Sequence, residues 1–478
     1  MTRLLAAGVI LAALATGCAD AARHKIALPP LASSPEPMTV FGQVTLAGAG
    51  DPAAPPDLPQ VPDRPLTLEE CLVIAEKVNP ALDSADQARV GALWDRWKSI
   101  TAFLPTAGTD YTARRYDQSP ANRPPSFSGT TQYSWQVGLS QSLFAGGRDV
   151  AGYILARLGV AAADIRRVQA REDLILDVKR TYFDILTSEK ALEVAQTSVV
   201  NLRSHLNVAQ NFYDVGMVPK NQVLEAEVNM AQAVQNANTL SRDLMVSKAH
   251  LNVLLRRPVD APVEVADILK HNEFPFSLQE CLALGLADRP ELKLGRNQVE
   301  AAGAKVGSAR SGLLPTVDLT YAHSTTGDTP RANGGWSSGD AASWNAAAVA
   351  SLNIWEWGRT KAEIEKSKVD LNRAMNDLTS LEDETRLNIT TNYQSLVSNG
   401  LNIDVAAKAV VSAAEDLRMV NERYLEQVAT NTEVLDAQTR YSQAQYDYYR
   451  ALHTYNLAWA TLERSLGRLV VASNGLKL

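Results

Sequence analysis

The sequence has little of what catalysis or nucleic-acid binding requires. Three cysteines and six scattered histidines offer no metal-ligand spacing, and we find no phosphate-binding loop and no nucleophile elbow. The net charge is −7, and no basic cluster with interleaved aromatic residues is present, which argues against a nucleic-acid partner. We therefore predict no enzymatic activity, no cofactor and no metal. The histidines expected at the surface are His24, His205, His250, His271, His323 and His453.

Cysteine is too scarce for a disulfide framework. Cys71 and Cys281 stand in similar segments, LTLEECL and FSLQECL, and residues related by a repeat are normally held far apart. We expect two small buried helix residues and no bond between them.

Residues 1–17 carry Arg3 as their only charge and an apolar run too short to cross about 30 Å of hydrocarbon. The small residues before Cys18 resemble a bacterial lipoprotein signal, although Ala15 stands where leucine is usual. This resemblance implies lipidation of Cys18 and, because Ala19 follows, delivery to the outer membrane. An ordinary signal peptide cut nearby is the alternative. Residues 18–65 are rich in proline and predict an extended tether.

Glycine and proline are absent from Val160 to Val215, and one apolar seam continues through this stretch. Its steps alternate between four and three residues, and the average of 3.5 predicts a helix that supercoils left-handed around partners. Such a helix would be about 85 Å long, more than a compact domain can cover. The seam consists of Val178, Thr181, Ile185, Ser188, Leu192, Ala195, Val199, Leu202, Leu206, Ala209 and Tyr213.

The seam recurs 211 residues later, where Val178 maps onto Ile389 and Tyr213 onto Tyr424. We therefore predict two repeats, over residues 66–258 and 277–469, with a tail over 470–478. A Gly-Arg pair precedes each long helix, and return helices are expected over Asn221–Arg256 and Glu433–Leu466. Capping boxes at Thr67 and Ser277 predict that each repeat opens with a helix, to Phe103 and to Leu313 respectively.

After Leu104-Pro105 and Leu314-Pro315 the apolar period changes to two, which predicts two strands in each repeat. Their loops are expected over residues 117–130 and 323–343. One apolar face and one small or polar face match a transmembrane barrel, and a soluble antiparallel sheet is the alternative. The alternating apolar residues are Tyr133, Trp135, Val137, Leu139 and Leu143, then Val317, Leu319 and Tyr321, then Trp344, Ala346, Ala348, Ala350, Leu352 and Ile354.

Aromatic residues Phe144, Trp355 and Trp357 stand where strand meets helix, as at a membrane interface. Four strands cannot close a barrel, and an open sheet edge cannot face lipid. We therefore expect the chain to oligomerise, and three copies would supply twelve strands.

Two repeats of helix, strand, strand, long helix and return helix resemble the TolC-like outer membrane factor family. The resemblance covers Leu66 to about Leu469 and is most specific at the turns, Tyr213–Glu225 and Tyr424–Ala437. It implies a mainly α fold: a homotrimer with an α-barrel in the periplasm and a 12-stranded barrel in the outer membrane of a Gram-negative bacterium. It also implies a passive export duct that docks on a periplasmic adaptor and an inner-membrane pump.

By position, the resemblance places a periplasmic gate of acidic residues at Glu433 and Asp436. An alternative for Glu433 is a capping box with Thr430. Family members often carry a basic residue where this chain has Ala429. The adaptor contacts implied by position are Gly216, Met217, Val218, Val428 and Ala429.

A different class of function stays open. A periplasmic coiled-coil scaffold or adaptor lipoprotein without a pore would share the long helices, but its strands would not need a lipid-facing side. Cell fractionation and bilayer conductance separate the two hypotheses. We expect the partner pump, and not this chain, to select the exported substrate.

Overall fold

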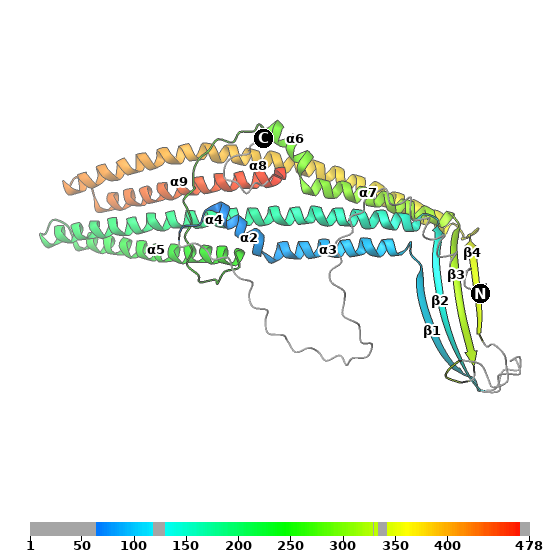
Figure 1. Ribbon diagram of the computed structural model, residues 1–478. Helices are drawn as coiled ribbons and strands as arrows, with labels where there is room; N and C mark the ends of the chain where they lie inside the picture. The colour runs from blue at the N-terminus through cyan, green and yellow to red at the C-terminus, as the bar shows by residue number, and fades with distance from the viewer. Residues whose placement is uncertain (1–63, 118–129, 328, 333–341, 469–478) are drawn as a thin grey trace. The chain divides into compact units, whose positions relative to one another are not determined.

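The computed structural model describes residues 64–117, 130–327, 329–332 and 342–468. Cys18, the predicted signal peptide, nearly all of the tether and the tail lie outside these residues, as do parts of both strand loops. The helices and strands follow the same order in each half of the chain (Figure 1).

The first half contains α2 (Leu68–Val78), α3 (Pro80–Thr101), β1 (Thr106–Arg115), β2 (Thr131–Ala145), α4 (Arg148–Asp214) and α5 (Lys220–Leu254). The second half contains α6 (Leu278–Asp288), α7 (Pro290–Arg310), the 3-10 turn η2 (Ser311–Leu313), β3 (Thr316–Gly327), β4 (Ala342–Ser351), α8 (Arg359–Leu425) and α9 (Asn431–Leu466).

The long helices α4 and α8 each have 67 residues and begin 211 residues apart, at 148 and 359. At 1.5 Å per residue each is about 100 Å long, so the predicted stretch was only the larger part of α4. Each packs along its return helix, α5 or α9, and α4 also contacts α7 and α9 of the other half. The predicted repeat of long helix and return helix is confirmed.

The prediction of a single opening helix in each repeat was wrong, because a proline divides it into two helices. Thr67 and Ser277 form the predicted capping boxes, but the helices end before Pro80 and Pro290 and restart with those prolines in the first turn. Proline disfavours a helical residue before it and suits the first turn of the next helix. Asn79 caps the new helix by accepting a hydrogen bond from the Ala81 amide.

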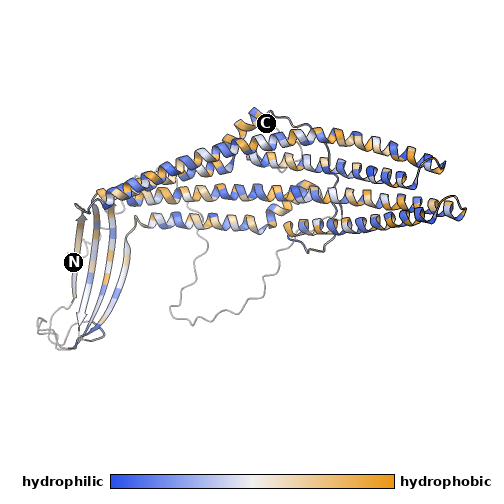
Figure 2. Ribbon diagram, turned by 180° about the vertical axis from the view of Figure 1, so that it is seen from behind, coloured by the Kyte–Doolittle hydropathy of each residue, from blue (hydrophilic) through white to orange (hydrophobic). Residues whose placement is uncertain are grey.

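The four strands form one antiparallel sheet in the order β1-β2-β3-β4. The prediction of two strands per repeat is confirmed, with two corrections at the ends. The strand β4 stops at Ser351, so Leu352 and Ile354 follow it, and β3 continues to Gly327, beyond the expected start of its loop. Hydrophobic and hydrophilic residues both occur along the strands (Figure 2).

Within the described residues, both outer strands of this sheet lie open on their two faces. Every residue of β1 is exposed, and nine of the ten residues of β4 are exposed. Large side chains such as Trp135, Tyr321 and Trp344 lie exposed on the sheet. A soluble sheet would bury one face against a core, so the chain alone does not provide what such a sheet needs.

The hydrophobic core lies among the helices. One cluster joins α2, α4 and α5 around Ile175, Tyr182 and Ile185, and a second joins α6, α8 and α9 around Ile389 and Leu462. None of the helices in the described part of the chain combines the length and apolarity needed to span a bilayer.

Seam residues at Val178, Ile185, Ile389, Leu396 and Ile403 are buried, as predicted. The repeat is not exact at its end: Tyr213 is 38% exposed, whereas its counterpart Tyr424 is only 4% exposed.

Gly285 marks the closest packing of α6 on the second core. A Cβ placed there would lie 2.3 Å from Ile389 Cδ1, which is itself fully buried. We expect Gly285→Ala to lower the free energy of unfolding by about 1–3 kcal/mol through overpacking. Adding Ile389→Val removes Cδ1 and should recover part of the loss. Denaturant unfolding of the four members of this double-mutant cycle tests the contact, and strictly additive effects would contradict it.

Candidate functional site

The two turns that join the long helices to their return helices are built alike. After α4, Gly216 has φ +73° and its amide donates to the Tyr213 carbonyl, while the Met217 amide donates to Phe212. After α8, Gln427 has φ +62°, and Gln427 and Val428 donate to Tyr424 and Arg423 in the same pattern. This is the Schellman ending of a helix. The second turn thus adopts, with glutamine, a left-handed conformation that favours glycine.

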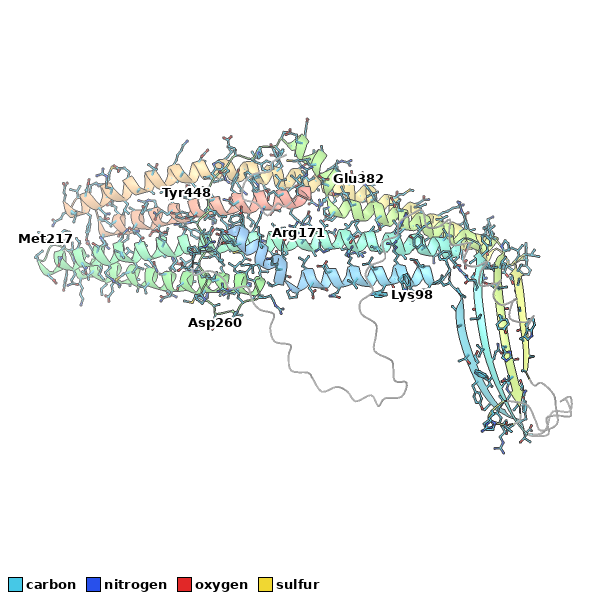
Figure 3. The ribbon with its side chains drawn as sticks, viewed as in Figure 1. Lys98, Arg171, Met217, Asp260, Glu382 and Tyr448 are labelled. Atoms are coloured by element: carbon cyan, nitrogen blue, oxygen red, sulfur yellow. The ribbon has the colours of Figure 1, made fainter. Side chains whose placement is uncertain are left out.

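The two turns contact each other through Gln427, whose side-chain amide donates to Met217 Sδ over 2.9 Å. Figure 3 shows Met217 at the turn between α4 and α5. Of the residues implied as adaptor contacts, Gly216, Met217 and Val428 are exposed and Val218 is half-buried. Ala429 is buried against Tyr424 and Val434, so it supports the turn from within.

The implied gate acids differ in their surroundings. Glu433 closes the capping box expected as its alternative role: its carboxylate accepts from the Thr430 amide at 3.2 Å and hydroxyl at 3.0 Å. The bond from the Thr430 amide is the first cause that lowers the pKa of Glu433. Asp436, three residues further along α9, is exposed. The capping role of Glu433 is confirmed, and the gate role of both acids stays a prediction.

Two arginines join α8 to α9 near this turn, where Ala429 supplies no charge. Arg423 Nη1 lies 3.8 Å from Glu433 Oε2, and Arg440 Nη2 lies 2.7 Å from Asp416 Oδ2. Because these pairs are largely exposed, solvent screens them and each contributes little to stability.

A polar cluster that was not predicted from the sequence, with two of its four residues buried, connects the two hairpins near their turns. We call it the latch cluster: His205 of α4, Glu225 of α5, and Asn431 and Thr432 of α9. His205 is 8% exposed, so its expected position at the surface was wrong. Its spacing from Leu202 and Ala209, three and four residues, could have placed it on the buried side.

Charged groups also join the halves further along α4. Lys179 Nζ donates to Glu463 Oε2 over 2.7 Å, and Arg464 binds Asp173 and Glu291. Beside Arg464, burial raises the pKa of Glu172 to about 7, against the opposing effect of the arginine charge. This network ties α4 to α7 and α9.

The expectations for the cysteines are confirmed. Cys71 and Cys281 are buried free thiols, and burial raises their pKa to about 12 and about 11. The histidines are less uniform than predicted, because His453 is largely buried and bonds Asp184 at 2.8 Å. In the described residues no group of three or more potential ligands could hold a metal ion.

The corners between sheet and long helices expose a band of aromatic side chains. Phe144, Trp355 and Trp357 are all exposed, and the two tryptophan rings pack edge to face with centroids 5.7 Å apart. Trp357 adopts φ +52°, the left-handed conformation of Gly146 in the first repeat. A side chain at Gly146 itself would meet the Ser311 carbonyl at 2.5 Å.

Comparison with known proteins agrees with this arrangement. A family model described as "Outer membrane efflux protein" matches residues 74–255 and 282–468, which is most of the chain. The chain belongs to the outer membrane efflux protein family.

Named relatives include the outer membrane efflux protein BepC of Brucella suis, 26% identical over 426 residues, covering 86% of this chain and 88% of the relative. Outer membrane protein TolC of Escherichia coli is 24% identical over 417 residues, covering 82% and 80%. Among solved structures, the Campylobacter jejuni outer membrane channel CmeC matches with a TM-score of 0.73 at 17% identity, covering 84% of this chain and 85% of that one.

The left-handed residue at the first turn gives a test of its geometry. A Cβ at Gly216 would touch nothing within 4 Å, so Gly216→Ala should cost only the backbone strain, about 1 kcal/mol of unfolding free energy. Gly91→Ala is the matched control: Gly91 also has open space around it but lies within α3, where alanine should stabilise by up to about 1 kcal/mol. Chemical denaturation should show opposite signs, and equal signs would contradict this geometry.

Proposed function

We propose that three copies of this chain close into a duct that passively carries substrates out through the outer membrane. The observation that supports it is the four-stranded sheet: among the described residues, β1 and β4 each have one edge without a strand partner, and their side chains are exposed. Pairing β4 of one copy with β1 of the next would satisfy both edges, and three copies would give twelve strands. The long helices would then continue the duct into the periplasm.

The adaptor contact is proposed at the two turns. Val215, Met217, Leu425 and Val428 are exposed apolar side chains at the ends of the helical hairpins. A patch of this kind suits an apolar partner surface. The names of several relatives, such as the "Toluene efflux pump outer membrane protein TtgF", refer to pumps, and we propose a periplasmic adaptor and an inner-membrane pump as partners here. The pump would select the substrate, and this chain would contribute no catalysis.

The scaffold hypothesis remains the second candidate, but it has less support. A scaffold that stays in the periplasm would have to bury the sheet against its own core, whereas Trp135, Tyr321 and Trp344 lie exposed. The aromatic residues at the sheet–helix corners also suit the boundary between hydrocarbon and water.

Conductance of the purified trimer in planar bilayers tests the duct and its gate together. We expect a cation-selective current, because three copies of Glu433 and Asp436 would line a narrow entrance. Glu433→Gln with Asp436→Asn removes these charges while glutamine can keep the capping box, so cation selectivity should fall without loss of folding.

The matched control is Glu365→Gln, which removes an exposed acid near the other end of α8. It should leave selectivity unchanged. Absence of any current from a folded trimer would overturn the duct, and unchanged selectivity in the double variant would leave the acids only a structural role.

Lipid anchoring through Cys18 has its own test. If Cys18 is lipidated, Cys18→Ser should abolish incorporation of labelled palmitate into the protein. The sheet would still hold the trimer in the membrane fraction, because its anchoring does not depend on the lipid. Equal labelling of the variant and the unaltered protein would rule out Cys18 as the attachment site, and recovery of the unlabelled variant in the soluble periplasmic fraction would favour the scaffold.

A further inference from the structure

The latch cluster joins the two helical hairpins through a buried pair, His205 and Asn431, that is bonded to the half-buried Glu225 and the exposed Thr432. His205 Nε2 lies 2.7 Å from Asn431 Oδ1, and Asn431 Nδ2 donates to Glu225 Oε2 over 2.9 Å. Thr432 Oγ1 donates to the other oxygen of Glu225 over 3.3 Å. His205 and Asn431 are only 8% and 1% exposed. Separating the hairpins would therefore break a connected set of bonds whose first member, between His205 and Asn431, is buried.

The hydrogen bonds of Asn431 determine which neutral tautomer of His205 is present. Because the amide nitrogen of Asn431 donates to the carboxylate of Glu225, its Oδ1 faces His205 as an acceptor. Nε2 of His205 must then carry the hydrogen, and the neutral ring has its lone pair on Nδ1. A proton taken up on acidification would go to Nδ1 and make the buried ring cationic.

Charge around this ring is sparse on every helix that packs against it. From α5 the carboxylate of Glu225 acts on His205, and it reaches the ring through Asn431. From α8 the neutral ring of Tyr424 lies with its centroid 4.9 Å away. The ring also borders a cavity of about 290 Å³ between α4, α8 and α9. The uncharged residues that line the cavity with His205 are Asn201, Leu202, Ser204, Val208, Leu417, Asn421, Tyr424, Leu425, Val434 and Gln438.

We propose that protonation of His205 weakens the latch cluster and lets the two hairpins separate, so that a more acidic periplasm favours the open form of the duct. The proposal rests on the proposed function for its consequence, because a wider entrance matters only in a channel. The latch itself is a property of the chain and can be measured without current.

Burial of His205 determines the direction in which pH changes the stability of the latched form. Burial lowers the pKa of His205, while the bond to Asn431 and the charge of Glu225 oppose that change. The latched form therefore binds fewer protons than a form in which the ring is in water. Its stability is fully present above the ordinary pKa of histidine, about 6.5, and is lost as the pH falls from there toward the lowered value.

Spin labels at the two turns measure the separation directly. Val215→Cys and Val428→Cys place labels at exposed positions on the two turns, while Cys71 and Cys281 are buried thiols with raised pKa values and should stay unlabelled. Cys18 is replaced by serine, and labelled chains are diluted with unlabelled ones in lipid nanodiscs. Pulsed electron resonance should show two intrachain distances. The fraction of molecules with the longer distance should grow several-fold between pH 7.5 and pH 5.5.

Three variants separate the latch from other titrating groups. His205→Gln keeps a donor for Asn431 but cannot titrate, so its distances should not change with pH. Glu225→Gln removes the charge that favours the proton, and its midpoint should move to lower pH. His453→Gln is the matched control, because His453 bonds Asp184 on α4 outside the latch cluster and should leave the response unchanged.

Distances in the unaltered chain that do not change with pH, or an equal response in His205→Gln, would overturn the proposal. Bilayer current measured on the same preparations distinguishes this failure from failure of the duct. A pH-dependent distance with no current at any pH would reject the duct and support the latch. A current with no pH-dependent change in distance would support the duct and reject the latch.

Discussion

Backbone hydrogen bonding at the sheet edges is the constraint on which the rest of the structure depends. Each unpaired amide or carbonyl group placed in hydrocarbon costs several kcal/mol, and in the part of the chain that the structure describes β1 and β4 each present one edge without a strand partner. No rearrangement of four strands removes both edges. Closure with other copies does, and it also explains why the sheet carries no core of its own. The small residues Ala346, Ala348 and Ala350 of β4 lie exposed on one side of the strand.

The helices meet a related problem along their length. A helix of about 100 Å cannot be buried by one compact core, so the described part of the chain divides its core among four clusters and gives each long helix a return helix as its nearest partner. Apolar side chains such as Leu387, Leu401 and Val405 still lie exposed along α8. The isolated chain therefore leaves apolar surface uncovered in its helical part as well as in its sheet.

Most of the fold could be predicted from the sequence because it depends on periodicity and on duplication. The seam from Val178 onward, the capping boxes and the change of period after Leu104-Pro105 are local signals, and each predicted a helix or strand that the structure contains. Local signals failed where the conformation or burial of a residue depends on residues distant in the sequence. Gln427 takes a left-handed conformation without being glycine because the turn geometry of the repeat requires it, and Tyr424 is buried while Tyr213 is exposed because they have different partners. The latch cluster joins residues more than 200 positions apart, a distance that periodicity cannot bridge.

Buried polar pairs distinguish the two repeats of the chain, which their similar apolar seams cannot do. Since α4 and α8 carry the same seam, hydrophobic packing alone would let α9 pair with either helix in much the same register. Lys179 and His205, which bond Glu463 and Asn431 of α9, correspond 211 residues later to Thr390 and Asp416.

The partners differ between the repeats too, because Glu463 and Asn431 correspond to Asn252 and Lys220 of α5. Exchanging the helices would leave Lys179 and Glu463 buried without each other, and an unpaired buried charge costs more than a well-made pair contributes. A polar group on an apolar seam can thus fix register and partner at some expense in stability. In this chain one of these groups, His205, is also titratable, so a contact that helps to select the pairing of the helices is one through which acidity would act on it.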